Sequence, residues 1–456
     1  MCGILGISSD KDDISVKMYE GLTYLQHRGQ DSAGIANEEL CIKSPGLVKS
    51  VFDEDKVKEL KSTMCVGHVR YSTTGTFDKS CIQPLESIYN GKNIYLCHNG
   101  NIINIDDIKK ILGNNEYTSD SKYLLELFIY KLNEYEILTS KVICNVCEFI
   151  IKNVKGSYSV LILIENFGMI AFRDFYGIRP LAYGTLKNNY IISSESNVIN
   201  ALEQQFIRDV NPGEIIVFEK NKMPIFYHNI KGVLNPCLFE YIYFSRIDSV
   251  IDGICVYDAR YRLGFLLGEK IKRLEIKDID VIVPVPDSSL IFALGLQESL
   301  NIKINYGLVK NPYIDRTFIM KDDKIINKSI KRKLNVIRSL LEGKNILIVD
   351  DSIVRGNTSS HIVYLAKKAG AKNIYMASGA PPILYPNKYG IFIESQKELI
   401  AVNRTEKDIA DIIGATSVIY NDLYAVIDCL KKINPNINGF EISMFNNQHL
   451  FKKIDI

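Results

Sequence analysis

The chain has 456 residues, more than one hydrophobic core usually organises, so two domains of roughly 200 residues each are expected. Lysine and arginine number 55 against 53 aspartates and glutamates, and no basic stripe interleaved with aromatic residues indicates a nucleic-acid groove. No apolar run approaches the ~20 residues of a membrane span, and the first residues lack a signal-peptide pattern. We expect a cytoplasmic protein that binds neither nucleic acid nor membrane, with its ten scattered cysteines reduced.

Short apolar segments that predict strands dominate the first 230 residues. They are GILGI, MCVGHVRY, IYLCHN, SYSVLILIE, GMIAFRD and EIIVFE. Helical periodicity covers residues 14–26, 104–112 and 120–134, which favours sheets with helices packed on them. Cys144 and Cys147 form a CxxC pair, but no second pair follows at zinc-site spacing, so we expect both to pack on an apolar helix face.

After residue 255, helices and apolar strands alternate. Helices are expected at 257–273, 289–299 and 358–370, and strands at 281–286, 345–351 and 373–379. This alternation predicts a parallel, doubly wound sheet. The sequence thus predicts a two-domain α/β protein, residues 2–230 and residues 231–456, with a helical extension at the C-terminal end. Because only His361 and His449 lie beyond residue 230, a histidine-based site is not expected there.

The second residue of the chain is a cysteine, Cys2, in the stretch MCGILGI. Removal of Met1 would give Cys2 a free α-amino group, whose reference pKa of about 7.7–8.0 leaves free base near neutral pH. That amine is able to take the thiol proton, and the thiolate is the reactive form of cysteine. Such a nucleophile needs no separate catalytic histidine, although the stretch alone also suits an ordinary first strand.

Four further positions in the first half suit either a catalytic or a structural role. Arg70 is able to grip a carboxylate through two hydrogen bonds, or to pair with a nearby acid. Asn99 and Gly100 follow a predicted strand, where they form either an oxyanion hole or a hairpin turn. Asp120 either binds a substrate ammonium or caps the helix beginning near Lys122. Each alone favours the structural role, but together behind Cys2 they favour a catalytic site.

These residues stand in HRGQDSAGI (27–35), GHVRYSTTG (67–75), CHNGNI (97–102) and TSDS (118–121). In this order, with GSYSV (156–160) and RDFYGIRPL (173–181), the motifs closely resemble the class II glutamine amidotransferase domain. The resemblance implies an N-terminal-nucleophile hydrolase fold, an αββα sandwich, in which Cys2 attacks the glutamine side-chain amide. It implies that Arg70 and Asp120 bind the glutamine carboxylate and amine. Asn99 and Gly100 would donate to the oxyanion.

The stretch NILIVDDSIVRGNTSS (345–360) indicates a phosphorylated sugar as the ligand of the second half. An apolar strand delivers Asp350 and Asp351 to its carboxyl end, where open α/β sheets bind ligands. These carboxylates suit sugar hydroxyls or Mg²⁺. A loop with Arg355 and Gly356 then enters a helix, whose first backbone N–H groups suit a monophosphate. The pattern resembles the phosphoribosyl-pyrophosphate (PRPP) motif of type I phosphoribosyltransferases.

Further stretches extend the resemblance to essentially the whole chain: CLFEYIYFSRIDS (237–249), VYDARYRLG (256–264), VPVPDSS (283–289), GLVKNPYIDRTFI (307–319) and GAPPILYPNKYGI (379–391). They resemble the glutamine PRPP amidotransferase family. Its members turn PRPP, glutamine and water into 5-phosphoribosylamine, glutamate and pyrophosphate, the first committed step of purine synthesis. The resemblance implies a homo-oligomer with glutamine and PRPP as substrates and Mg²⁺ as cofactor.

The same resemblance assigns roles in the second half. Ser288, Asp350 and Asp351 would hold Mg²⁺ and, with Ser352, the PRPP. The cradle of the 5-phosphate would be formed by Val354, Arg355, Gly356, Asn357, Thr358 and Ser359. Lys310, Tyr313 and Arg316 match a segment that closes over pyrophosphate and shapes the ammonia path. Cations there would stabilise the charge on the leaving group.

Several positions depart from the family pattern. Ser289 stands where glycine is usual, which removes backbone freedom beside pyrophosphate. Asp315 replaces a common glycine before Arg316, and in the flexible loop around residues 321–335 Asp323 and Ile326 stand where glutamine and arginine are usual. These changes bear on closure of the site and on its coupling to the glutaminase.

Some family members hold an iron–sulfur cluster through four cysteines, but here only Cys237 stands at such a position. Asn387 occupies the second position, and no cysteine follows Cys429. Because a cluster ordinarily needs four protein ligands, we expect none, with Cys237 a small buried residue. The cluster-free branch also implies a mature chain that begins at Cys2 without a propeptide.

Two other functions share part of these motifs. A glucosamine-phosphate synthase has the same glutaminase domain but needs sugar-isomerase modules and a longer chain, and the PRPP motif argues against it. A PRPP-sensing binding protein could keep VDDSIVRG without chemistry, but it would have no use for a glutaminase site.

Overall fold

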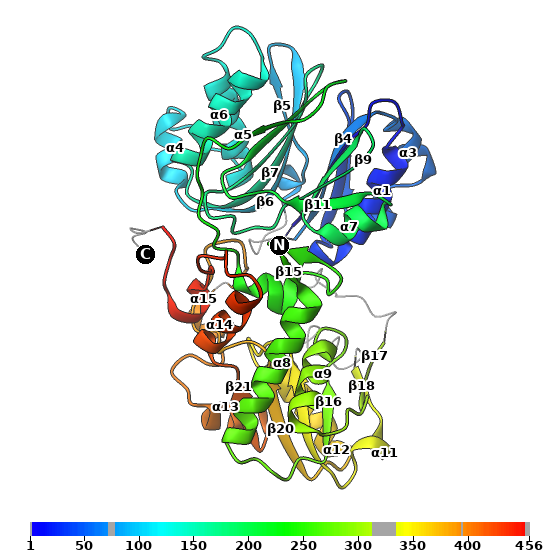
Figure 1. Cartoon of the computed structure of the whole chain (residues 1–456), viewed down its shortest axis with the longest axis vertical. Coiled ribbons are helices and arrows are strands. Elements are labelled where there is room, and N and C mark those ends of the chain that lie inside the picture. The colour runs from blue at the N-terminus through cyan, green and yellow to red at the C-terminus, as the bar shows by residue number, and fades with distance from the viewer. Residues whose placement is uncertain (1, 72–77, 312–333, 394, 452–456) are drawn as a thin grey trace.

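The computed structural model describes residues 2–71, 78–311, 334–393 and 395–451, which form two lobes (Figure 1). The upper lobe in Figure 1 holds the elements from β1 to β13, and the lower lobe holds the parallel sheet of the second half. Within the described ranges, no helix combines the length and apolarity needed to cross a bilayer. All ten cysteines are free thiols.

The first lobe contains two antiparallel sheets. The seven-stranded sheet has the order β11-β9-β10-β1-β4-β2-β3. Its strands are β1 (Gly3–Ser8), β2 (Ser32–Ala36), β3 (Cys41–Pro45), β4 (Met64–Arg70), β9 (Ala182–Leu186), β10 (Asn189–Ser193) and β11 (Gln205–Asp209). The six-stranded sheet has the order β13-β12-β8-β7-β6-β5. Its strands are β5 (Leu85–Tyr89), β6 (Lys92–Ile102), β7 (Gly156–Ile164), β8 (Gly168–Arg173), β12 (Ile215–Glu219) and β13 (Ile225–Tyr227).

Strand alternation produces four layers in this lobe. Successive residues of β1 point to opposite faces, so Ile4 lies in the core between the sheets while Leu5 lies in the core under the helices. The helices on the seven-stranded sheet are α1 (Ser15–Tyr24) and α7 (Ser196–Ala201), with short helices α2 (Val48–Val51) and α3 (Glu54–Glu59) nearby. Those on the six-stranded sheet are α4 (Ile105–Ile111), α5 (Asp120–Leu132) and α6 (Ser140–Asn153). The predicted αββα sandwich is confirmed.

The two cysteines of the CxxC pair lie on the apolar face of α6. Cys144 and Cys147 are both fully buried in the core that α5 and α6 form with the six-stranded sheet. They therefore pack, as predicted.

The second lobe is built on a parallel sheet in the order β16-β19-β20-β21. Its strands are β16 (Val281–Pro284), β19 (Asn345–Asp350), β20 (Asn373–Ser378) and β21 (Ser417–Tyr420). One face packs against α8 (Val256–Arg273) and α9 (Leu290–Leu300), the other against α12 (Asn357–Lys368) and α13 (Glu406–Ile413). Helices on both faces confirm the predicted doubly wound sheet.

Smaller elements complete this lobe. They are the pairs β14 (Val250–Ile251) with β15 (Ile254–Cys255) and β17 (Leu308–Lys310) with β18 (Leu334–Val336), the helix α11 (Arg338–Leu341), and the π-helical turn η3 (Glu240–Phe244). The helices α14 (Leu423–Ile433) and α15 (Ser443–Asn446), red in Figure 1, lie beside the junction of the lobes. Side chains from η3, α8 and α14 share one core with Ile178 of the first lobe, so the lobes are joined by a continuous apolar contact.

Candidate active sites

Cys2 directly precedes β1, the strand that lies between β4 and β10 in the seven-stranded sheet. Its backbone nitrogen donates to Asn99 Oδ1 at 3.2 Å, and its carbonyl oxygen accepts from Arg28 Nε at 3.0 Å. The thiol lies 3.8 Å from the carbonyl oxygen of Tyr71. Both backbone polar groups of the buried residue are thus anchored, which holds the sulfur in place.

Asn99 and Gly100 lie inside β6, which continues to Ile102. The expectation that they follow a strand is therefore wrong, and so is the alternative that they form a hairpin turn. The Nδ2 atom of Asn99 is buried and has no hydrogen-bond partner within the described part of the chain. At Gly100, φ is +155° and a Cβ would lie 1.9 Å from the carbonyl oxygen of Ser157, so only glycine fits. An unpartnered amide donor next to a glycine is a composition that suits an oxyanion hole.

Arg70 and Asp120 reach the same pocket from different elements. Arg70 ends β4, and its Nη1 is buried without a partner among the described residues. Asp120 is the first residue of α5, but the helix is capped by Ser119, whose hydroxyl accepts from Lys122 N at 3.2 Å. The capping alternative for Asp120 is therefore wrong, because its carboxylate accepts instead from Ile102 N at 3.1 Å and from Ser121 N.

These side chains converge on one pocket. It is lined by Cys2, Arg70, Tyr71, Cys81, Gln83, His98, Gly100, Ser119, Asp120 and Ser121. A guanidinium and a carboxylate stand near a thiol, an arrangement that suits the carboxylate and ammonium of an α-amino acid whose side chain reaches the sulfur.

Three pocket residues that the sequence did not single out form a hydrogen-bonded group. His98 N donates to Gln83 Oε1 at 2.6 Å, Gln83 Nε2 donates to Ser121 Oγ at 3.1 Å, and Ser121 Oγ lies 2.9 Å from His98 Nδ1. Burial lowers the pKa of His98, so its ring is neutral at pH 7. The adjacency of His98 to Asn99 was the only available signal, since Gln83 and Ser121 are distant in sequence.

A second set of polar residues gathers at the carboxyl end of the parallel sheet. Asp350 ends β19, and Asp351 follows it. Asp351 accepts hydrogen bonds from the hydroxyls of Ser288 and Ser352, the latter at 2.6 Å. Burial and the neighbouring charge of Asp351 raise the pKa of Asp350 well above its ordinary value. A cation bound beside these two buried carboxylates would offset their mutual repulsion.

This acidic pair fits Mg²⁺ shared with a phosphorylated substrate. The described residues contain no group of three or more histidine, cysteine, aspartate or glutamate side chains arranged to hold a metal by themselves. Mg²⁺ is commonly held by one or two carboxylates together with substrate phosphates and water, which is the donor set that Asp350 and Asp351 offer.

The loop after Asp351 leads into a helix start that suits a phosphate. Gly356, with φ of +78°, precedes α12, and a Cβ there would lie 2.3 Å from Ile400 Cδ1. Among the residues that the structure describes, no side chain caps α12, so the first N–H groups of this helix suit a ligand. Asn357 and Thr358 are exposed at this end, and Ser359 is buried. The Val354 side chain packs against the core instead, so only its backbone is available to a phosphate.

Three other predicted positions are placed as follows. The guanidinium of Arg355 pairs with Glu398, with Nε 2.6 Å from Oε2, and Lys310 on β17 pairs with Asp287 at 2.7 Å. Ser289 is buried, and its hydroxyl donates to Val285 O at 2.6 Å, so the turn accommodates a serine at the position expected to be glycine. Outside the described residues lie Tyr313, Asp315, Arg316, Asp323 and Ile326.

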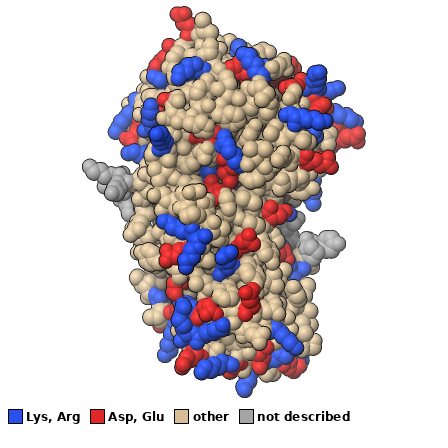
Figure 2. All heavy atoms as spheres, viewed as in Figure 1, with Lys and Arg blue, Asp and Glu red and all other residues tan. Residues whose placement is uncertain are grey.

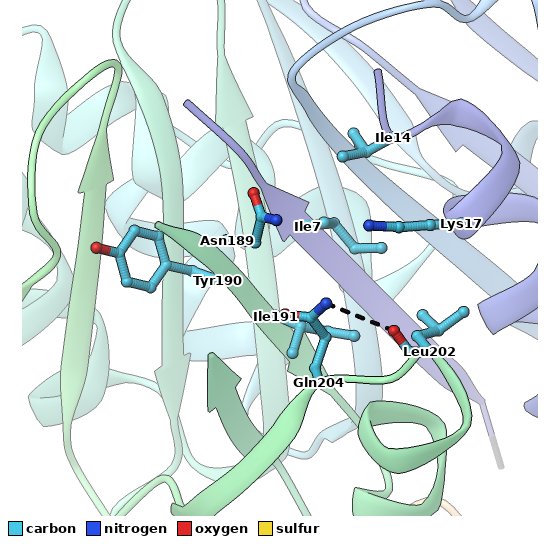
Figure 3. Close-up of a pocket in the computed structure, with 8 residues that line it drawn as sticks. All are labelled: Ile7, Ile14, Lys17, Asn189, Tyr190, Ile191, Leu202 and Gln204. Carbon is cyan, nitrogen blue, oxygen red and sulfur yellow. Dashed lines mark hydrogen bonds between the residues drawn. The ribbon is translucent and has the colours of Figure 1, made fainter. Parts of the chain in front are cut away.

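Another small pocket lies beside β1 and β10 (Figure 3). It is lined by Ile7, Ile14, Lys17, Asn189, Tyr190, Ile191, Leu202 and Gln204. The Gln204 amide donates to Leu202 O at 3.4 Å, and the lining holds neither a thiol nor a carboxylate. On the face in Figure 2, basic and acidic side chains are intermixed. The two sites already described therefore remain the candidates for chemistry.

One lobe has a buried thiol beside a strand with an unpartnered amide donor, and the other has a carboxylate pair beside a helix start, an arrangement typical of a glutamine amidotransferase joined to a phosphoribosyltransferase. A family model described as a glutamine amidotransferase domain matches residues 68–201. The chain is 42% identical to the amidophosphoribosyltransferase of Escherichia coli, over 100% of this chain and 94% of that protein. It is 39% identical to the amidophosphoribosyltransferase of Saccharomyces cerevisiae, over 99% and 92% of the two chains.

A solved structure gives the same result. The glutamine PRPP amidotransferase from B. subtilis superposes with a TM-score of 0.86 at 32% identity, covering 98% of this chain and 97% of that one. The chain belongs to the amidophosphoribosyltransferase family. It is a glutamine-dependent enzyme that aminates PRPP in purine biosynthesis, as the sequence predicted.

Proposed function

We propose that Cys2, freed at its amino group by removal of Met1, is the nucleophile of the glutaminase half-reaction. The observation that carries this proposal is the contact of Cys2 N with Asn99 Oδ1 at 3.2 Å, which places the future α-amine beside the oxyanion amide. The amine takes the thiol proton, and the sulfur adds to the side-chain carbonyl carbon of glutamine. The tetrahedral intermediate expels ammonia, which carries that proton away, and water then hydrolyses the thioester to glutamate.

The neighbouring residues are proposed to bind glutamine and to stabilise the oxyanion. Arg70, with an unpartnered buried Nη1 among the described residues, holds the glutamine carboxylate, and Asp120 holds its ammonium. Asn99 Nδ2 and the Gly100 N–H donate to the oxyanion. Burial and the charge of Arg70 lower the pKa of His68 to about 3, and burial lowers that of His98. Both rings are therefore neutral, and the α-amine serves as the base.

The second lobe would bind PRPP at the end of its parallel sheet. Ser288, Asp350 and Asp351 would hold Mg²⁺, which when bound neutralises charge on the departing pyrophosphate. Ser352 and the cradle of residues 354–359 would orient the ribose 5-phosphate, with the α12 N–H groups as donors. Lys310, Tyr313 and Arg316 are proposed to close over the pyrophosphate. Ammonia from Cys2 attacks the anomeric carbon as pyrophosphate leaves.

We propose that the chain holds no iron–sulfur cluster. Cys237 is buried beside Glu441, with which it pairs in a parallel bridge, and burial raises the pKa of its thiol to about 12. The amide of Asn387 donates to Glu441 Oε2 at 3.0 Å and to Ser443 Oγ at 3.4 Å. A hydrogen-bonded polar group thus occupies the surroundings of Cys237. Iron and acid-labile sulfide are expected to be absent from anaerobically purified protein; stoichiometric amounts would refute this.

The domain boundary, the cellular setting and the oligomeric state are also proposals. We divide the chain into residues 2–230 and 231–456, because β13 ends the first lobe at Tyr227 and η3 begins the second at Glu240. Ten free thiols suit a reducing, cytoplasmic setting. A homo-oligomer is expected from the family, and light scattering of the purified chain tests it.

One assay tests the central proposal. Purified protein is given PRPP and Mg²⁺ with either glutamine or ammonium chloride, and pyrophosphate release is measured. Release with both nitrogen donors is expected, and glutamate should form only with glutamine. Glutamine hydrolysis without pyrophosphate release under any condition would point to a different acceptor and refute the assignment of the second lobe.

A further inference from the structure

The side-chain amide of Gln83 bridges two elements of the pocket beside Cys2. Gln83 lies just before β5 and is 5% exposed. Its Oε1 accepts from the backbone nitrogen of His98 on β6 at 2.6 Å, and its Nε2 donates to Ser121 Oγ on α5 at 3.1 Å. Because a backbone N–H only donates, the contact with His98 N fixes which end of the amide faces which neighbour. The hydroxyl oxygen of Ser121 therefore accepts from Gln83.

The hydroxyl of Ser121 then has one proton to donate and two neighbouring acceptors. His98 Nδ1 lies 2.9 Å from Ser121 Oγ, and Asp120 Oδ1 lies 3.3 Å from it. Asp120 Oδ1 already accepts from Ser121 N at 2.7 Å. The shorter contact assigns the hydroxyl proton to His98 Nδ1. A ring nitrogen that accepts is bare, so the neutral ring carries its own proton on Nε2.

The surroundings of His98 Nε2 agree with this tautomer. A Cβ at Gly100 would lie 2.9 Å from His98 Nε2 and 1.9 Å from the carbonyl oxygen of Ser157, so both atoms border the same glycine. Burial is the largest influence on the pKa of His98 and lowers it, while the charge of Asp120 and the carbonyl of Ser157 oppose that shift. Since a carbonyl oxygen only accepts, it favours an N–H over a lone pair on the nearby ring nitrogen.

The tautomer decides what the ring presents to the strand that carries Gly100. An Nε2–H directs the positive end of the ring dipole toward this glycine, whereas a bare Nε2 directs a lone pair there. Negative charge that develops on a carbonyl oxygen beside Gly100 is stabilised by the first arrangement and repelled by the second. In a buried pocket such fixed dipoles act strongly, because they need no reorganisation during the reaction.

We propose that Gln83 is a positioning residue of the glutaminase half-reaction, which acts by holding His98 as the Nε2–H tautomer beside Gly100. Gln83 orients the Ser121 hydroxyl, the hydroxyl orients the ring, and the ring sets the electrostatic potential at the oxyanion strand. The inference rests on the proposed function, since it takes Gly100 as an oxyanion donor. His98 takes up no proton in this scheme, because the α-amine of Cys2 is the base.

Nuclear magnetic resonance of the full-length wild type, labelled with ¹⁵N in its histidine rings, reads the tautomer directly. Long-range ¹H–¹⁵N spectra at pH 7.5 separate a ring nitrogen that carries a proton from one that does not, and His98→Gln identifies the signals of His98. We expect a protonated Nε2 and a bare Nδ1. A protonated Nδ1 in the wild type would overturn the inference, since Ser121 would then donate to Asp120 instead.

Kinetics test the consequence for the reaction, with a matched control in the same lobe. Gln83→Met replaces the amide with an apolar group of similar shape, and Asn104→Leu does the same outside the pocket. Asn104 likewise accepts from a backbone nitrogen, Lys155 N at 2.8 Å, and donates to a carbonyl, Asn153 O at 2.9 Å. In Gln83→Met we expect the glutamine-dependent kcat to fall about 10- to 100-fold, with a much smaller change in KM for glutamine and the ammonium-dependent rate retained. Asn104→Leu should keep the wild-type kcat and KM.

Two kinetic results would overturn the positioning role: a wild-type kcat for glutamine in Gln83→Met, whatever its KM, or equal losses of kcat in Gln83→Met and Asn104→Leu. Melting temperatures show whether each variant is folded. If Gln83→Met does not fold, Ser121→Ala takes its place, with the same loss of kcat expected and a wild-type kcat decisive against the inference. A wild type that forms no glutamate from glutamine would instead refute the proposed function, whichever tautomer its His98 adopts.

Discussion

The backbone nitrogen of Cys2 donates to Asn99 Oδ1 at 3.2 Å, although 97 residues separate the two in the chain. The contact uses the oxygen of the Asn99 amide and leaves its buried Nδ2 without a partner in the described part of the chain. In the proposed mechanism, this one side chain positions the nucleophile and also presents a donor where negative charge develops during amide attack.

Asn99→Asp separates these two roles, because it keeps an acceptor for Cys2 and replaces the donor with a carboxylate oxygen. We expect the glutamine-dependent kcat to fall about 10²- to 10³-fold, the usual loss of one oxyanion donor. The ammonium-dependent rate should not change, and initial rates with both donors measure the difference. Asn104→Ala, which removes a side chain that accepts from Lys155 N outside the pocket, is the control. Equal effects on both rates would exclude Asn99 from the oxyanion hole.

Cys2→Ala removes the thiol but not the acceptor site in the other lobe. The glutamine-dependent reaction should disappear, while synthesis from ammonium at high pH should persist because free ammonia then reaches PRPP directly. Mass spectrometry of active wild-type protein should show Met1 absent, since the α-amine must lie on Cys2. A folded variant that loses both activities equally would contradict the division of labour between lobes.

The strongly apolar strands and long helices could be predicted from sequence. The expected helix at 257–273 is α8, and the expected strand at 345–351 is β19, each within one residue at either end. Strands that went unpredicted are short or rich in glycine and serine, such as SAGIA in β2 and AYGTL in β9. Their order comes from pairing with distant strands, as when β1 pairs with both β4 and β10, and local periodicity does not encode that pairing.

In the candidate sites, too, residues in local motifs could be predicted from the sequence, whereas contacts between distant segments could not. Cys2, Arg70, Asn99 and Asp120 lie in local motifs. Cys2, Arg70 and Asp120 line one pocket, and Asn99 contacts Cys2, while their catalytic roles stay predictions. Arg28 and Glu240 both stand inside motifs of the sequence, but neither had an assigned role. The hydrogen bond that Arg28 donates to Glu240 depends on how two lobes meet across 212 residues, which a single sequence does not reveal.

Asp351→Asn tests the acidic pair. Removing one carboxylate lessens the attraction for Mg²⁺ and breaks the acceptor for Ser288 and Ser352, so we expect a higher KM for PRPP and a weaker dependence on Mg²⁺. Glutamine hydrolysis should persist, with some loss of its stimulation by PRPP. Titrations of PRPP and Mg²⁺ provide the measurement, and Asp422→Asn, at an exposed partner of Lys270, is the control. Unchanged PRPP kinetics would remove Asp351 from the site.

His68 gives the first lobe a specific sensitivity to acid. Its ring is fully buried, and Nε2 lies 3.2 Å from His98 O, to which the neutral ring donates. Burial and the charge of Arg70 lower its pKa to about 3, against about 6.5 in an unfolded chain. Between pH 6.5 and 3, His68 is therefore protonated in the unfolded chain but neutral in the folded chain. The stability that His68 contributes is complete above pH 6.5 and is lost as the pH falls toward 3.

His68→Gln removes this titration and keeps a side-chain donor for the carbonyl of His98. We expect the variant to be somewhat less stable than the wild type at pH 7.5 but to lose less stability on acidification, since the His68 penalty grows by about 1.4 kcal/mol per pH unit below 6.5. Thermal melting between pH 7.5 and 4.5 measures the two slopes. His228→Gln, at a ring whose side chain is 55% exposed, should retain the wild-type slope. If His68→Gln and the wild type lose melting temperature in parallel over this range, His68 does not enter the folded state as the neutral ring described here.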